Sequence, residues 1–149
     1  MSIVTLNDRG VRSVSAFGSL NTGSMIFISK VTASSSATID FTSGIDSTYK
    51  EYIFTFKNIH PATDNAELQF QADTGTNTNY NQTITSTHFR SRHDEADSTT
   101  SLSYLTSGDQ AQGTSFQMLT NKVGNGNDEH TSGYLHLFNP SSTTFINIL

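Results

Sequence analysis

The sequence has 149 residues, a length typical of one domain with a single core. Eight Lys and Arg against 13 Asp and Glu give a formal net charge of −5 without a basic stripe, so nucleic-acid binding through phosphate contacts is not expected. The sequence contains no cysteine, no polybasic amphipathic segment and no apolar run near the ~20 residues of a membrane helix, so we expect neither disulfides nor membrane insertion.

The first 23 residues, MSIVTLNDRGVRSVSAFGSLNTG, differ from the rest of the chain. Asp8 could cap a short helix, although Gly10 and Gly18 disfavour one. Because isolated segments of this length do not hold structure alone, we interpret residues 1–23 as an arm that docks on a partner protein. The alternative is a leading segment laid over its own domain. The residues expected to contact the partner are Leu6, Arg9, Val11, Arg12, Val14 and Phe17.

Residues 24–149 predict a β-rich body, because Ser, Thr and Asn are abundant and long runs of helix formers are missing from the sequence. Residues 24–32 (SMIFISKVT) are partly apolar on both faces, which is typical of a central strand. Residues 33–42 (ASSSATIDFT) predict a strand with Ile39 and Phe41 on one face.

The stretch from Tyr49 to Asp73 is the expected centre of the fold. Tyr52, Phe54 and Phe56 recur at a period of two, which predicts a strand with one aromatic face. The turn formers HPATDN come next, and then a second strand with Leu68 and Phe70 on its apolar face. We therefore predict that these two strands pair antiparallel with their apolar face on the core.

The second half of the sequence predicts further short strands at 83–90, 102–105, 114–120, 133–138 and 143–149, separated by polar loops or turns at 74–82, 91–101, 108–113, 122–132 and 139–142. Phe116 and Met118 are expected to point inward. In residues 133–138, Leu135 and Leu137 lie on the face opposite Tyr134, His136 and Phe138. About nine short β segments at this spacing are typical of a sandwich or a barrel, and of the two we predict an antiparallel β-sandwich.

The sequence ends in FINIL, which is apolar to the carboxylate. One interpretation is that this strand closes a sheet. The other is that the fold lacks its last strands and leaves an open edge, which would recruit a strand from another chain. On the second interpretation we expect a homo-oligomer.

No pattern in the sequence predicts catalysis or a bound metal. His88 and His93 are five residues apart across a strand end, so no single regular element presents both to a metal. Residues 124–130 (GNGNDEH) resemble a calcium loop only faintly and are more typical of a β connection. The sequence has no G-x-S-x-G nucleophile motif, and nothing brings Asp40 and Glu67 together as paired carboxylates. We therefore assign no catalytic, cofactor-binding or metal-binding residues.

One candidate binding site remains in the exposed loops. Tyr80 could supply an aromatic platform for a sugar, while His93 and Asp94 could hydrogen-bond its hydroxyl groups. These three residues are the candidate contacts to a host glycan. His136, between Tyr134 and Phe138, is interpreted as a hydrogen-bonded core or interface histidine.

Five stretches carry a resemblance: LNDRGVRSVSAFGS, TASSSATIDFTSGIDSTYKEYIFTFKNIHPATDN, TSTHFRSRHDEADS, AQGTSF and GNDEHTSGYLHLFNPSSTTF. Together they cover most of the chain, which resembles small structural or tail-associated virion proteins of marine tailed bacteriophages, cyanophages in particular. The N-terminal stretch is similar to a leading peptide that many such proteins share. The resemblance implies further β segments after FNPSSTTF, whereas this sequence stops at INIL.

The resemblance implies a jelly-roll type of sandwich over 24–149, preceded by the arm at 1–23, and no enzymatic activity. It implies a virion structural protein, associated with the tail as a fibre or fibre-attachment component. Its partners would be other virion proteins and further copies of itself, with a trimer as one compatible form. The chain would be made in the host cytoplasm and released by lysis. Two alternatives stay open: a capsid decoration or head-fibre protein, and a host-glycan-binding adhesin module.

Overall fold

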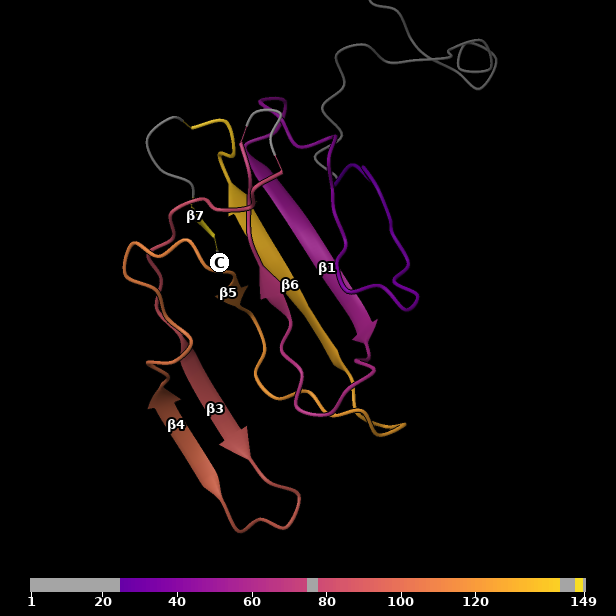
Figure 1. Ribbon diagram of the computed structural model, residues 1–149, viewed down its shortest axis with the longest axis vertical. Coiled ribbons are helices and arrows are strands. Elements are labelled where there is room, and N and C mark those ends of the chain that lie inside the picture. The colour runs from indigo at the N-terminus through magenta and orange to yellow at the C-terminus, as the bar shows by residue number, and fades with distance from the viewer. Residues whose placement is uncertain (1–24, 75–77, 143–146, 149) are drawn as a thin grey trace, which may run out of the picture. The chain divides into compact units, whose positions relative to one another are not determined.

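The computed structural model describes residues 25–74, 78–142 and 147–148. The chain divides into two units, residues 1–31 and residues 32–149. The described residues form seven β-strands in three small antiparallel sheets and no helix, so an all-β fold is confirmed (Figure 1). Accordingly, the described residues include no helix of the length and apolarity needed to cross a membrane.

The largest sheet has three strands in the order β1-β6-β7, which are Glu51–Ile59, Thr131–Phe138 and Asn147–Ile148. The two long strands lie side by side (Figure 1), with Tyr52 opposite Leu137 and Phe54 opposite Leu135. The register shifts between Phe56 and Ile59, which marks a β-bulge. Aromatic and aliphatic residues that face each other across an antiparallel pair stabilise the sheet.

The apolar core is centred on this sheet. Tyr52, Leu135 and Leu137 are the only large apolar side chains among the described residues that are buried, with 3 to 6% of their surface exposed. The buried ring of Tyr52 keeps its hydroxyl satisfied, because the hydroxyl oxygen accepts the Asp46 backbone N–H at 3.0 Å. Phe41 packs edge-on against Phe54, with ring centroids 5.5 Å apart. The core is therefore built by one strand pair and the segment that precedes it.

Two shorter sheets make up the rest of the described fold. β2 (Gln69–Phe70) pairs with β5 (Gln117–Met118), and β3 (Phe89–His93) pairs with β4 (Thr100–Tyr104) as a hairpin. Isolated bridges join Ala66 to Val123 and Ile84 to Gly113.

The buried amide of Gln71 ties these segments together. Its Nε2 group lies 3.0 to 3.2 Å from the carbonyl oxygens of Gln82, Thr114 and Ser115. Its Oε1 accepts the Ala72 backbone N–H at 2.8 Å. A single side chain thus satisfies backbone groups that no sheet ladder pairs.

The predicted pairing of the two central strands is wrong. β1 pairs with β6, and the strand containing Phe70 pairs with β5. The physical reason is length, because eight-residue β6 offers the nine-residue β1 a long partner whose Leu135 and Leu137 complete its aromatic face. The second predicted strand is only two residues long, Gln69–Phe70.

The predicted strands at 24–32 and 33–42 are also wrong, because residues 25–42, the described part of these segments, contain no strand. Met25 is 85% exposed, and Ile39 and Phe41 are exposed as well. A run of β-formers becomes a strand only where a partner edge satisfies its backbone, and here none of the described strands does so.

The strand predicted at 83–90 is reduced to a bridge at Ile84 and the start of β3. Here side-chain hydroxyls supplement a few backbone–backbone hydrogen bonds, since Ser86 Oγ and Thr85 Oγ1 accept the backbone N–H groups of Gln110 and Gln112. The predicted charged loop at 91–101 is shorter than expected, because both of its ends belong to the β3–β4 hairpin. In the strand predicted at 114–120, only Gln117–Met118 forms, and Phe116 is exposed rather than inward.

Other predictions hold. The strand at 133–138 lies within β6, and its predicted buried face of Leu135 and Leu137 is confirmed. The predicted turn after it is confirmed by the Ser142 N–H, which bonds the Asn139 carbonyl at 2.9 Å. Of the last predicted strand, residues 147–148 form β7, and the remainder lies outside the described residues.

Candidate functional site

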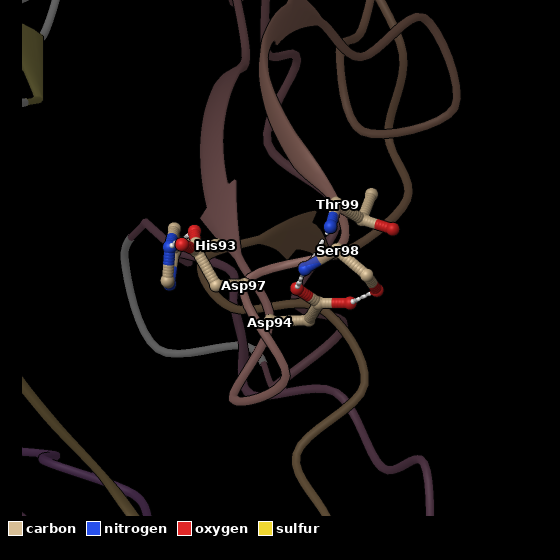
Figure 2. A network of polar contacts seen from close by, with 5 residues as sticks. All are labelled: His93, Asp94, Asp97, Ser98 and Thr99. Atoms are coloured by element: carbon tan, nitrogen blue, oxygen red, sulfur yellow. Dashed lines mark hydrogen bonds and ion pairs between the residues drawn. The ribbon is translucent and has the colours of Figure 1, made fainter.

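Two of the three predicted glycan contacts lie where β3 leads into the loop to β4, with His93 as the last residue of β3 and Asp94 as the first of the loop. Figure 2 shows that the Asp94 carboxylate points back into this loop. It accepts the backbone N–H groups of Ser98 at 2.7 Å and Thr99 at 2.8 Å, and the Ser98 hydroxyl at 2.5 Å. On the other side of the loop His93 Nε2 lies 2.7 Å from Asp97 Oδ1. Asp94 therefore closes the hairpin in the manner of an Asx turn.

These hydrogen bonds fix the charge of Asp94. The Ser98 hydroxyl and then the Thr99 backbone stabilise the carboxylate, which lowers the pKa of Asp94 to about 2. Asp94 is thus ionised at neutral pH, with both oxygens already engaged inside the loop. The role that these contacts give Asp94 is to stabilise the conformation of the loop between β3 and β4.

Tyr80, the third predicted glycan contact, lies in a different environment. Its backbone N–H bonds Asp73 Oδ2 at 3.2 Å, and its φ of 47° places it in the left-handed region. Partial burial, and then the charge and hydrogen bond of Asp40, raise the pKa of Tyr80. Among its interactions none is shared with His93 or Asp94. The structure therefore does not assemble the three residues around one point, and their contact with a glycan stays a prediction.

The Gly- and Asn-rich segment 124–130 folds around its own acidic residue. Glu129 Oε2 accepts the Gly126 backbone N–H at 2.6 Å, and His60 Nε2 lies 2.8 Å from the Gly126 carbonyl oxygen. A Cβ at Gly124 would overlap the Glu129 carboxylate, so glycine is required for this approach. No three His, Asp or Glu side chains gather as a possible metal site in the part of the chain that the structure describes.

His136 is hydrogen-bonded as predicted but does not lie in the core, and its alternative role at an interface stays a prediction. Its Nδ1 lies 2.7 Å from Glu51 Oε1 on the neighbouring strand, so it is hydrogen-bonded as expected. It is half-exposed and lies on the face opposite Leu135 and Leu137, which places it outside the core.

The predicted docking residues of the arm, Leu6 to Phe17, lie outside the described residues. Residues 25–31, which belong to the first unit, are described. Five of their apolar side chains are exposed, those of Met25, Ile26, Phe27, Ile28 and Val31.

A second exposed apolar surface lies on the β3–β4 hairpin and was missed by the sequence reasoning. Phe89, Leu102 and Tyr104 share one face, which we call the aromatic hairpin face. Phe89 and Leu102 are 68% and 80% exposed, and the rings of Phe89 and Tyr104 meet edge-on at 5.2 Å. The Tyr104 hydroxyl donates to Asp109, which raises the pKa of Tyr104. The alternation of Phe89, Ser91 and His93 with two arginines could have indicated this face.

No family model, no curated protein and no solved structure matches this chain. The resemblance to virion proteins therefore rests on the sequence stretches that carry it.

Proposed function

We propose that the chain is a structural component of a bacteriophage virion, associated with the tail as a fibre or a fibre-attachment protein. Residues 1–23 dock on a neighbouring virion protein. The β body assembles with further copies into an antiparallel β-sandwich of jelly-roll type. The resemblance of five sequence stretches to small virion proteins of marine tailed phages supports this proposal, and the all-β architecture is compatible with it.

The imbalance between buried and exposed apolar side chains carries the proposal. The described residues bury three large apolar side chains, Tyr52, Leu135 and Leu137, while thirteen others are exposed. A chain of this length normally buries a larger core, and monomeric proteins seldom expose contiguous apolar patches of more than a few hundred Å². Burial against other chains would supply the missing apolar contacts, as it does in obligate assemblies.

The aromatic hairpin face is the best-defined part of this surface. A two-stranded sheet is marginally stable alone, and β3 and β4 have no third strand among the described residues. A partner that covers Phe89 and Leu102 would remove two large apolar side chains from water and stabilise the hairpin. A homo-oligomer, with a trimer as the compatible closed form, would present the same face on every copy.

Light scattering on the full chain tests the assembly. At micromolar concentration we expect a homo-oligomer, and a well-folded monomer would contradict the proposal. In the variant Leu102→Thr the oligomer should dissociate at higher protein concentration than in the wild type. The control Ile53→Thr removes an exposed apolar side chain from β1 instead and should change assembly less. Equal losses in both variants would exclude a specific role for the hairpin face.

The position in the particle is tested separately. In purified phage particles the chain should be a minor protein that imaging locates on the tail. Stoichiometry equal to that of the capsid protein would instead identify a decoration or head-fibre protein.

A further inference from the structure

An open groove of about 440 Å³ lies between β3 and the segment 119–122 that follows β5. We propose that this groove binds a small acidic saccharide, with its cationic side chains holding a carboxylate or phosphate and its polar side chains holding hydroxyl groups. The volume lies within the range of small-ligand sites. The groove lies within one copy of the chain, so this inference does not depend on the virion role.

The charge of the groove is the first argument. Arg90, Arg92 and Lys122 all line it, and they are half of the six Lys and Arg that the described residues contain. No Asp or Glu is among its described lining residues, although the whole sequence has a net charge of −5. The fold thus concentrates positive charge in this groove, although the whole sequence is acidic. A cluster of like charges is unfavourable unless an anion compensates it.

The second argument is that these cations have few protein partners. Both ion pairs found among the described residues involve histidine, and neither includes an Arg or a Lys. Arg90 donates from Nη1 to Asn121 Oδ1 at 3.2 Å, and its buried Nε has no partner in the described part of the chain. A guanidinium has five N–H donors, so most of those on Arg90 stay available to a ligand or to water. Arg–carboxylate and Arg–phosphate pairs are the strong, geometrically specific contacts that such donors make.

The third argument is the way in which the fold builds the site. Arg90 and Arg92 alternate with Phe89 and Ser91 along β3 and therefore project from the face opposite the aromatic hairpin face. Ser101 and Ser103 lie opposite Arg92 and Arg90 on β4, so small side chains flank the two arginines. The side-chain amide of Asn121 is held in one orientation by two hydrogen bonds, because its Nδ2 donates to Glu67 Oε1 at 3.4 Å while its Oδ1 accepts from Arg90.

The remaining lining indicates the chemical class of the ligand. Thr120 and Asn121 add a hydroxyl and an amide group, which can hydrogen-bond the hydroxyls of a sugar. A bare inorganic anion would use only the cations. A nucleic-acid backbone would need a longer basic surface than one groove on an acidic chain. A small sugar that carries one negative group uses both kinds of side chain.

Binding is measured by NMR chemical-shift titration of the full chain with galacturonic acid and with glucose 6-phosphate. Galactose and glucose are the neutral counterparts, and inorganic phosphate is the anion without a sugar. We expect the backbone amides of residues 88–92 and 119–122 to shift with at least one acidic sugar, and neither neutral sugar to shift them. Binding should be about tenfold tighter than for inorganic phosphate, the factor that one added hydrogen-bonding group supplies.

Two variants test the residues. Arg92→Gln and Lys122→Gln remove exposed charges, so the fold should survive, and each should weaken binding about tenfold through one lost charge-assisted contact. The control Lys57→Gln makes the same charge change on β1, outside the groove, and should leave the affinity unchanged. Equal effects of the three variants, equal binding of neutral sugars, or phosphate bound as tightly as the acidic sugars would overturn the inference.

Discussion

Replacing Gln71 by glutamate tests whether one buried amide holds the short strands together. The side chain of Gln71 is 8% exposed, and its Nε2 group faces three carbonyl oxygens at 3.0 to 3.2 Å. The change Gln71→Glu keeps the shape of the side chain but replaces this donor by a carboxylate oxygen. The carboxylate would face the carbonyls of Gln82, Thr114 and Ser115 without a proton to share.

The magnitude is set by these contacts. A buried carbonyl that loses its donor costs about 1–3 kcal/mol, and an uncompensated buried charge costs more, so Gln71→Glu should lower the free energy of unfolding by about 3–5 kcal/mol at pH 7. The apolar variant Gln71→Met removes the donor without adding charge and should cost about 2 kcal/mol. The exposed control Gln112→Glu adds the same charge elsewhere and should stay within about 0.5 kcal/mol of the wild type.

The pH dependence of the free energy of unfolding separates the cost of the buried charge from the cost of the lost hydrogen-bond donor. Carbonyl oxygens and burial favour the neutral carboxyl, so the carboxyl that Gln71→Glu introduces has its folded pKa raised above the unfolded value of ~4.3. The deficit of Gln71→Glu relative to the wild type is therefore largest above the folded pKa, and it shrinks as the pH falls towards ~4.3. The deficit of Gln71→Met should not change over that range. Urea unfolding followed by tyrosine fluorescence from pH 4 to 8 measures both variants. A Gln71→Glu deficit that is small or independent of pH would refute the role assigned to the amide.

Three further predictions concern single positions. Leu135→Ala should cost about 2–5 kcal/mol in urea unfolding, whereas Tyr134→Ala should cost under about 1 kcal/mol, because these neighbours are 3% and 71% exposed; equal costs would contradict the assigned face of β6. An NMR titration of Asp94 should show a pKa of about 2. Because this pKa is depressed, the stability that the Asp94 carboxylate contributes is present above the usual value of 3.8 and is lost as the pH falls through 2. A midpoint near 3.8 would contradict the loop geometry. Gly124→Ala should displace the Glu129 carboxylate and speed hydrogen exchange of the Gly126 amide, while Gly133→Ala, whose added Cβ meets no atom within 4 Å, should leave that amide unchanged.

The sequence predicts local faces better than it predicts partners. The alternation in residues 133–138 correctly places Leu135 and Leu137 on the buried face, because a period of two is a property of the strand itself. The partner of β1 depends instead on β6, which is far away along the chain. A turn signal such as His60–Asn65 indicates where the chain bends and does not indicate which strand it then pairs with.

Short strands fail for a related reason. Residues 25–31 have a strong β composition and stay unpaired among the described strands, since composition supplies no hydrogen-bonding partner. Residues 83–87 are rich in Thr and Ser, and two of their hydroxyls accept backbone N–H groups beside a few backbone–backbone hydrogen bonds, so a continuous ladder does not form. No periodicity distinguishes these cases before the neighbouring segment is known.

The candidate sites show the same limit. Tyr80, His93 and Asp94 were grouped by residue type, yet Asp94 is engaged in closing its own loop and Tyr80 neighbours Asp73. Arg90 and Arg92 were not grouped with Lys122, because no spacing rule joins residues that β3 and the segment after β5 bring to one groove. Chemistry that depends on tertiary neighbours is visible only once the topology is known.

The β3–β4 hairpin joins both proposals in one element. Its alternating residues place Phe89, Leu102 and Tyr104 on one face and the two arginines on the other. A partner chain on the aromatic hairpin face would therefore leave the two arginines uncovered, although Phe89 also lines the groove. The Arg90–Asn121 hydrogen bond connects the arginine face to the body. Because a two-stranded sheet is marginal alone, contacts on both faces should act on the same folding equilibrium. Assembly and ligand binding would then reinforce each other by stabilising one hairpin, in which Phe89 belongs to both sites.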